Sequence, residues 1–216
     1  MGPDSRCYPL DVLSVRHRQR RQAVDDINRN ASGSITISEQ VTDPTTRNRY
    51  LVNSLIDEAI TSSQLEGAST SHLVANGMIR TGRAPRDVSE RMIWNNYRAM
   101  QRIIELQEEP LSVDLVLEIH RIVTEGTLER PETAGRLQTP GEERIAVYSD
   151  QNTVVHVPPP ASELPARPAR VCDFANGAET ESYMPTVLRA ITVHFMIGYD
   201  HPFEDGNGRT ARALFY

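Results

Sequence analysis

Residues 201–212, HPFEDGNGRTAR, hold the side chains of this sequence that are best suited to chemistry. Within twelve residues the segment has a histidine, two acids, a Gly-Asn-Gly turn and two arginines. An imidazole takes a proton near neutral pH, a carboxylate is a hard ligand for Mg²⁺, and guanidinium groups pair with phosphate oxygens. Each group alone is more often structural. Together they are typical of a site that binds a polyphosphate and moves a proton.

The two glycines mark the predicted phosphate-binding part of this segment. Gly206, Asn207 and Gly208 lie between an apolar helical stretch and a stretch that again has helical spacing. Glycines at such a junction let successive backbone N–H groups point into one concave site, and the start of the next helix adds partial positive charge. Arg209 and Arg212 are three residues apart, so they project from nearly one helix face. These five residues are predicted to bind a polyphosphate.

The loop also carries a candidate base and a candidate metal ligand. His201 stands at the loop entrance and has a side chain suited to taking a proton. Asp205 adjoins the glycines, and Mg²⁺ normally binds through one or two carboxylates plus substrate phosphates. Phe203 alternates with the polar residues and is expected to point into the core. We therefore predict a base at His201 and a Mg²⁺ ligand at Asp205.

Four segments with helical periodicity are expected to position the loop. Their apolar residues recur three and four apart, which gives each helix one buried stripe. Asp87 and Ser112 are candidate N-caps, and Gly67 stands where a left-handed residue would end a helix. The expected helices cover residues 46–66, from Asp87 through Ile104, from Ser112 to Gly126, and from Pro185 to Gly198.

The period changes over residues 144–160, RIAVYSDQNTVVHVPPP. Two short alternating runs surround the turn-rich tetrad 149–152, which predicts a β-hairpin that the prolines close. A hairpin alone is only marginally stable in water, so it must lie on the helical body or receive a partner strand. The predicted fold is therefore mainly α with one small hairpin.

Composition excludes several classes of protein. The 216 residues carry a net charge of −6, which argues against a protein that coats nucleic acid. The basic run at 16–21 is interpreted as a solvated helix face. Cys7 and Cys172 are too few for a disulfide framework. With no apolar run long enough to span a bilayer and no secretory segment, we expect a cytoplasmic protein without a membrane partner.

HPFEDGNGRTAR resembles the signature of the Fic family, H-x-F-x-[D/E]-G-N-G-R-x-x-R, and matches it at every specified position. Upstream, AGRLQTP and VHVPPP resemble the region that holds the family's flap. The resemblance covers roughly residues 50–216 and implies a helical bundle with a hairpin flap. It also implies an N-terminal helical region over 1–110 and a Fic core over 111–216, whose last helix is cut short at Tyr216.

The resemblance implies transfer of AMP from ATP to a hydroxyl side chain of a target protein. His201 would deprotonate a Ser, Thr or Tyr hydroxyl, which attacks the α-phosphorus in line. Asp205 would hold the Mg²⁺ that bridges the phosphates. The hairpin at about 145–157 would bind an extended segment of the target by strand addition.

The same resemblance gives the nucleotide-binding residues their roles. The amides around Gly206 and Gly208, with Asn207, would hold the α- and β-phosphates. Arg209 would support the inner phosphates, and Arg212 would pair with the γ-phosphate. Such an arrangement acts by positioning and electrostatic stabilisation, as phosphoryl-type transfers require.

A second motif, SSQLEG, lies far upstream at residues 62–67. Ser62 and Glu66 are four apart, hence on one helix face, and an anion near a helix C-terminus is unfavourable unless a cation meets it. An exposed glutamate remains an alternative on this evidence. However, SSQLEG resembles the family's inhibitory motif [S/T]-x-x-x-E-[G/N], which ends here at Gly67. The resemblance implies that Glu66 pairs with Arg212 and keeps the γ-phosphate out of its productive position.

Two residues depart from the family's usual pattern. Asp200 precedes His201 where many relatives carry an aliphatic residue, and its carboxylate is expected to raise the pKa of the histidine. Gln138 stands near a position where relatives often have an arginine.

Three alternatives to an autoinhibited adenylyltransferase stay open. The same loop could transfer another nucleotide or phosphocholine, and it could remove AMP from a modified target with Glu66 aligning a water molecule. The third alternative is a non-catalytic protein that senses nucleotides. A homo-oligomer is compatible with all of them, and no nucleic-acid partner is expected from this segment.

Overall fold

The computed structural model describes residues 44–106, 108–149, 151–178 and 184–215. Cys7, the basic run at 16–21 and Asp150 of the expected hairpin turn lie outside these residues, so the interpretations placed on them stay predictions. Within the described ranges, no helix combines the length and the apolar character needed to cross a bilayer.

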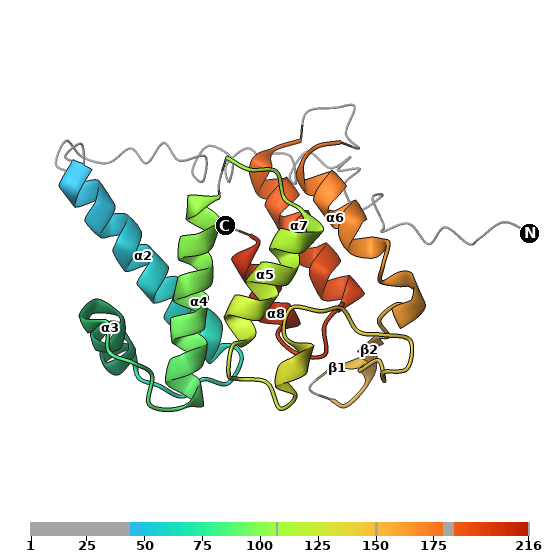
Figure 1. Ribbon diagram of the computed structural model, residues 1–216, viewed down its shortest axis with the longest axis horizontal. Coiled ribbons are helices and arrows are strands. Elements are labelled where there is room, and N and C mark those ends of the chain that lie inside the picture. Colours follow the sequence, from blue (N-terminus) through green and yellow to red (C-terminus); the bar gives the residue numbers. More distant parts are fainter. Residues whose placement is uncertain (1–43, 107, 150, 179–183, 216) are drawn as a thin grey trace, which may run out of the picture.

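The described chain is mainly helical and carries a small antiparallel hairpin, as the sequence predicted (Figure 1). The α-helices are α2 (Pro44–Gln64), α3 (His72–Thr81), α4 (Val88–Glu105), α5 (Val113–Thr124), α6 (Arg167–Ala175), α7 (Thr186–Asp200) and α8 (Asn207–Ala213). Short 3₁₀ turns cover Pro131–Thr133 and Ala161–Glu163. The strands are β1 (Val147–Tyr148) and β2 (Val154–His156). The division into a region 1–110 and a core 111–216 stays a prediction.

The helix ends differ from the predicted ones at two places that matter for the site. The helix α2 ends at Gln64 rather than Glu66, and Gly67 takes the left-handed conformation expected of it, with φ 89°. The helix α7 does not end at Gly198 but continues to Asp200. His201 is therefore the residue that caps α7, in a left-handed conformation with φ 45°.

Two predicted N-caps are confirmed, and two helices were not predicted. The Asp87 carboxylate accepts a hydrogen bond from Glu90 N at 2.8 Å, and the Ser112 hydroxyl accepts one from Leu115 N. The helices α3 and α6, which were not predicted, are only 10 and 9 residues long. Gly77 lies inside α3 and Pro168 in the first turn of α6. Glycine and proline usually indicate turns or helix ends, so these two segments did not look helical in the sequence.

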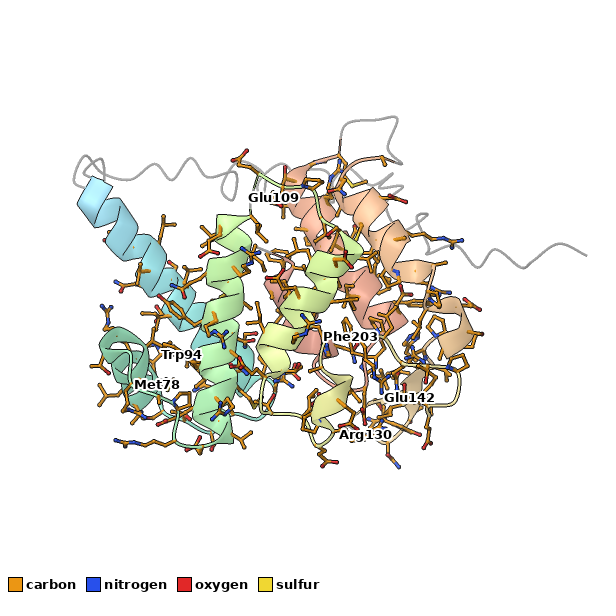
Figure 2. All side chains as sticks on the ribbon, viewed as in Figure 1. Met78, Trp94, Glu109, Arg130, Glu142 and Phe203 are labelled. Atoms are coloured by element: carbon orange, nitrogen blue, oxygen red, sulfur yellow. The ribbon has the colours of Figure 1, made fainter. Side chains whose placement is uncertain are left out.

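Two clusters of buried side chains form the core, and a third joins them. The first lies between α2, α3 and α4, where Figure 2 shows Met78 and Trp94 close together. The second lies between α5, α6, α7 and α8 and includes Phe203, which is fully buried. Ala99, Ile119 and Ala213 belong to the third cluster, which connects α4, α5 and α8. The end of α2 is thereby held close to α8, although the two are far apart in the sequence.

The hairpin lies against the end of α7 and has an apolar, exposed surface. Val147 pairs with His156 and Tyr148 with Val154, and the ladder is irregular between these pairs. Pro158 and the proline after it are buried where the chain leaves β2. The exposed apolar residues of the hairpin and its flanks are Ile145, Val147, Tyr148, Val154, Val155 and Val157.

A buried ion pair joins α6 to α7. The Arg167 guanidinium lies 2.7 Å from the Asp200 carboxylate, and the two side chains are only 8% and 2% exposed. Arg167 also pairs with Glu163 one turn before it. A buried charge that loses its partner is strongly destabilising, because it can no longer be solvated.

We expect Arg167→Met to lower the free energy of unfolding by about 3–5 kcal/mol, because it leaves the Asp200 carboxylate buried without its ion pair. Denaturant unfolding of the variant and wild type measures the difference. The double variant Arg167→Met/Asp200→Leu is the control and should recover most of the loss, since it removes both charges. A single variant as stable as wild type would contradict the structural importance of this pair.

Candidate functional site

The loop between α7 and α8 is fixed at its centre by Phe203. This side chain points into the core, as predicted, and its ring stacks on His120 of α5 at 3.7 Å between centroids and 7° between planes. Asn207 closes the loop, because its amide accepts from Phe203 N at 2.9 Å and donates to Phe203 O at 2.8 Å. Contacts within the protein therefore hold the loop in a defined conformation.

Asn207 also contacts the candidate base. Its side-chain nitrogen lies 3.2 Å from Nδ1 of His201, and the other contacts of Asn207 identify that nitrogen as a donor. In the neutral imidazole, Nδ1 is then the acceptor and the proton lies on Nε2. For Nε2 to accept a proton, the ring proton has to move to Nδ1 and the contact with Asn207 has to give way.

The surroundings of His201 lower the pKa of its imidazole. Burial is the main cause, and the positive charge of Arg144 and the nearby His156 add to it. The pKa is not raised overall, as the neighbouring Asp200 carboxylate could have led one to expect, because burial prevails; Asp200 itself pairs with Arg167. A lowered pKa keeps the imidazole neutral at pH 7, which is the form that accepts a proton.

Asp205 presents the exposed carboxylate of the loop. Its side chain is 57% exposed, with Oδ1 accepting a hydrogen bond from Gly206 N and Oδ2 lying 3.2 Å from Arg209. Within the described residues, no cluster of three or more His, Cys, Asp or Glu side chains could enclose a metal ion. A single accessible carboxylate fits Mg²⁺, which keeps several waters and takes further ligands from substrate phosphates.

One face of α5 supports the loop, a role that was not predicted from the sequence. His120 Nε2 donates to the Asp205 carbonyl at 2.9 Å, while Nδ1 accepts from Gly135 N at 2.8 Å. A Cβ added at Gly206 would lie 2.5 Å from the Thr124 methyl group, and this glycine also has φ 80°. A signal was present in the sequence, since the spacing of His120 places it on the buried stripe of its helix.

Arg209 is turned into the protein rather than toward solvent. One of its terminal nitrogens donates to the Val123 carbonyl at 2.9 Å and to the Thr127 hydroxyl at 3.0 Å, at the end of α5. Burial is the main cause that lowers the pKa of this guanidinium. Here Arg209 ties α8 to the C-terminal carbonyls of α5, where a cation is favourable. Its predicted contact with the inner phosphates stays a prediction.

Arg212 joins the second motif to the loop. Its Nε donates to the Ser62 hydroxyl at 2.8 Å, and its Nη2 forms an ion pair with the Glu66 carboxylate. Both charged side chains are partly buried, at 19% and 28% exposed. The structure thus brings together the residues that the two motifs predicted to meet.

Gly208 gives the Glu66 carboxylate room to approach α8. A Cβ added at this glycine would lie 2.5 Å from Glu66 Oε1 and 3.2 Å from Arg212 Nη1. On the other side, Asn96 of α4 donates to the Ser63 hydroxyl at 2.8 Å and fixes the end of α2. The carboxylate therefore occupies a prepared place between the backbone of Gly208 and a guanidinium.

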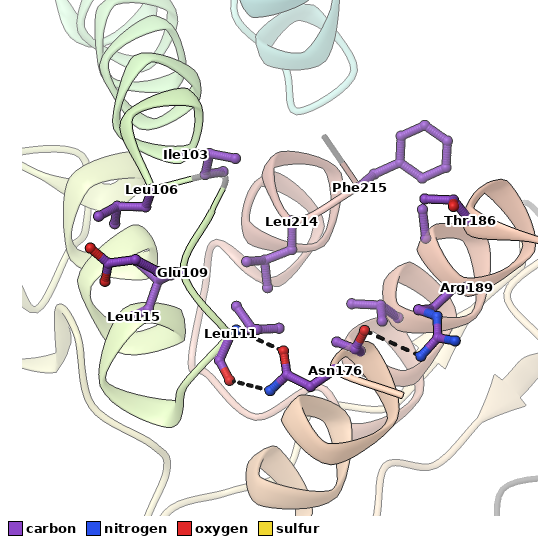
Figure 3. A pocket seen from close by; sticks show the side chains of 13 residues that line it. Ile103, Leu106, Glu109, Leu111, Leu115, Asn176, Thr186, Arg189, Leu214 and Phe215 are labelled. Atoms are coloured by element: carbon purple, nitrogen blue, oxygen red, sulfur yellow. Dashed lines mark hydrogen bonds between the residues drawn. The ribbon is translucent and has the colours of Figure 1, made fainter. Parts of the chain in front are cut away.

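A separate hollow lies away from this loop. It measures about 380 Å³ and is lined by the ends of α4, α6 and α8 with the starts of α5 and α7 (Figure 3). Asn176 exchanges two hydrogen bonds with the backbone of Leu111 at its edge. None of residues 201–212 lines this hollow, so it is distinct from the candidate site.

The fold and the loop agree with a known family. A model described as the Fic/DOC family matches residues 110–216. The chain belongs to the Fic/DOC family. Its signature loop, with His201 at one end and Arg212 at the other, lies within the matched residues.

Curated relatives of this Fic chain are longer proteins. Protein adenylyltransferase fic-1 of Caenorhabditis elegans is 29% identical over 160 residues, which cover 72% of this chain and 29% of the relative. Protein adenylyltransferase Fic of Nematostella vectensis is 25% identical over 223 residues, which cover 95% of this chain and 48% of the relative. The Fic chain spans less than half the length of either relative.

Solved structures have the same fold. A Fic-domain-containing signalling protein from Bacteroides thetaiotaomicron has a TM-score of 0.69 at 21% identity, over 80% of this chain and 65% of that one. Fic-1 from C. elegans has a TM-score of 0.62 at 20% identity, over 91% of this chain and 58% of that one. At such identities the similarity establishes only the fold of this Fic chain.

We expect His120 to make stability depend on pH. Burial lowers the pKa of its imidazole from 6.5 to about 4. As the pH falls from 6.5 to 4, the unfolded chain takes up a proton that the folded chain does not, so unfolding becomes easier by up to about 3 kcal/mol. Denaturant unfolding at several pH values across this range measures the free energy of unfolding. This free energy should fall more steeply with decreasing pH for wild type than for His120→Gln. Parallel pH dependences would contradict the assignment of a neutral, buried His120.

Proposed function

We propose that this Fic chain is an autoinhibited protein adenylyltransferase, which transfers AMP from ATP to a Ser, Thr or Tyr hydroxyl of a target protein. The observation that carries the proposal is the place of the Glu66 carboxylate, between Arg212 and the backbone of Gly208. An anion already occupies the position that the motif would offer to a phosphate. Family membership and the names of the two curated relatives support the choice of reaction.

His201 would act as the general base of the transfer. It takes the proton of the target hydroxyl while the oxygen forms a bond to the α-phosphorus of ATP. The bond from that phosphorus to the bridging oxygen breaks, and pyrophosphate leaves with the electron pair. The lowered pKa of His201 supports this role, because it keeps the base unprotonated at neutral pH.

The remaining loop residues would bind and orient the triphosphate. Asp205 is the residue that would hold Mg²⁺, which neutralises charge on the phosphates when bound. The backbone of Gly206 and Gly208 would line the α- and β-phosphates, with Asn207 keeping the loop in shape. Arg209 stabilises the loop through its hydrogen bonds to the end of α5. Arg212 would bind the γ-phosphate once Glu66 has left.

The inhibition follows from competition for one guanidinium. Glu66 and the γ-phosphate cannot both occupy Arg212, so the ion pair must break before ATP binds productively. A hydrogen bond to a charged group contributes roughly 1.5–3 kcal/mol net. Each 1.4 kcal/mol changes a population about tenfold. The state with a free Arg212 should therefore be about 10–100 times less populated than the state in which Glu66 and Arg212 are paired.

The hairpin is the surface that would receive the target. Its exposed side chains are largely apolar, and both of its strands are short. An extended segment of the target could add to it as a further strand, because main-chain hydrogen bonds tolerate many sequences. The hairpin contacts the end of α7, where His201 lies, so a docked segment would be close to the base.

We expect Glu66→Gly to raise the rate of transfer by about 10–100-fold, because it frees Arg212 for the γ-phosphate. The measurement is automodification with labelled ATP, located by intact mass and peptide mapping. The double variant Glu66→Gly/His201→Ala is the control and should be silent, since loss of a general base removes a factor of roughly 10²–10⁴. A folded Glu66→Gly protein that binds ATP but is no faster than wild type would falsify the inhibitory role of Glu66.

We expect Asp205→Asn to remove the effect of Mg²⁺ on ATP binding, because the neutral amide is a poor ligand for this ion. Calorimetry with and without Mg²⁺ measures the affinity of wild type and variant. Wild type should bind ATP more tightly with Mg²⁺, whereas the variant should bind equally under both conditions. Asp173→Asn on the exposed side of α6 makes the same charge change elsewhere and should behave like wild type. An Asp205→Asn protein with an undiminished Mg²⁺ effect would exclude Asp205 as the metal ligand.

A further inference from the structure

Three consecutive carbonyls at the end of α7 accept hydrogen bonds from the hairpin region. His156 Nε2 donates to Tyr199 O at 2.7 Å. Arg144 donates to Asp200 O and, at 2.8 Å, to His201 O. The last carbonyls of a helix have no partners within the helix, and a cation near them is favourable. These contacts explain why α7 continues past Gly198 and ends at the residue before His201.

Arg144 and His156 stand at the two sides of the hairpin's base. Arg144 lies just before β1, and His156 is the last residue of β2, where it pairs with Val147. The Nε of Arg144 also donates to the carbonyl of Pro159 at 2.9 Å, which closes the base of the hairpin. The hairpin and the end of α7 are therefore joined through the same two side chains.

Gln138 completes this set of contacts. Its side-chain oxygen accepts a hydrogen bond from Arg144, and its backbone N–H donates to Pro202 O at 2.9 Å. Gln138 stands near a position where, by the family resemblance, relatives often have an arginine, and Arg144 from later in the chain supplies a guanidinium beside it. The carbonyls before and after the His201 side chain are thus held by residues of one upstream segment.

His201 needs such support because its backbone is strained. A left-handed conformation such as φ 45° is unfavourable for a residue other than glycine, and it persists only if its surroundings enforce it. The backbone N–H of His201 bonds to Ile197 O at 2.9 Å and its carbonyl bonds to Arg144, so both peptide groups are fixed. The direction of the imidazole depends on this backbone.

We propose that Arg144 and His156 are positioning residues for His201, which join the base of the hairpin to the end of α7 and so set the imidazole in its working direction. The inference rests on the proposed function, because only the proposed transfer makes His201 a general base. It adds that the hairpin does more than receive a target. A segment docked on the strands would lie on the same unit that holds the base.

The central test measures transfer in the Glu66→Gly background, where the base is the limiting feature. Arg144→Lys keeps the charge but loses the forked guanidinium, and Arg144→Gln loses both. We expect kcat to fall by about 10–100-fold in each variant, since small misplacements of a catalytic group have effects of this size. The KM for ATP and the calorimetric affinity for ATP with Mg²⁺ should stay the same in both variants, because Arg144 does not contact the predicted phosphate site.

The matched control is Arg136→Lys. Arg136 lies in the same segment and pairs with Glu142 through both terminal nitrogens, and its hydrogen bonds within the described residues stay inside that segment. This variant should keep the kcat of its parent. A fall in kcat equal to that of Arg144→Lys would mean that the whole segment acts only through stability, and it would overturn the proposal.

His156 provides a second, independent pair of variants. His156→Phe keeps an aromatic ring against Tyr199, where the two rings lie 4.5 Å apart, but loses the donor to the carbonyl. His156→Gln keeps a donor at the end of the side chain and loses the ring. We expect Gln to restore most of the kcat that Phe loses. The opposite order would assign His156 to ring packing alone and would overturn its positioning role, even if the Arg144 variants fail to fold.

A titration separates this proposal from the proposed function. If the Glu66→Gly parent transfers nothing, the proposed function fails, and the His201 ring can still be followed by nitrogen NMR. Arg144→Gln should then raise the pKa of His201 and change its ring signals, whereas Arg144→Lys should keep the pKa and change the signals. Ring signals that are identical in wild type and both variants would show that Arg144 does not set the orientation of His201.

Discussion

The stack of Phe203 on His120 is the contact on which the rest of the loop depends. It places the middle of the loop against α5, so that Asp205 comes within reach of His120 and the backbone of Gly206 fits against Thr124. Asn207 then closes on Phe203 from the other side and pairs with both of its backbone polar groups. The shape of the loop is therefore fixed by contacts within the protein, which lowers the cost of ordering it on binding.

The parts of the site that the sequence could predict are those that depend on short spacing. The order of base, acid, glycines and arginines within twelve residues indicates a phosphate site without knowledge of the fold. The caps at Asp87 and Ser112 and the alternating hairpin follow equally local rules. The pairing of Glu66 with Arg212 needed the family resemblance, because 146 residues separate the two and nothing local connects them.

The parts that could not be predicted depend on neighbours supplied by other segments. Arg209 and Asn207 were predicted to contact phosphate, which stays a prediction, but their contacts with α5 and Phe203 were not predicted. Asp200 looked like a charge beside the base, but α6 provides a buried partner for it. Gly198 looked like a helix end, whereas donors from the hairpin extend α7 beyond it. In each case a contact with a segment distant in the sequence decided the outcome, and such contacts exist only once the helices have packed.

The partly buried pair between Glu66 and Arg212 has a thermodynamic consequence of its own. Ser62 lies in the last turn of α2 and Glu66 in the turn that follows it, and both contact Arg212, so displacing that end of α2 from α8 would release the guanidinium. If the γ-phosphate requires this release, any molecule that holds α2 away from α8 raises the affinity for productively bound ATP. By reciprocity, ATP raises the affinity for that molecule by the same factor. The contact would then respond to two inputs, with cellular ATP setting how strongly a partner of α2 must act.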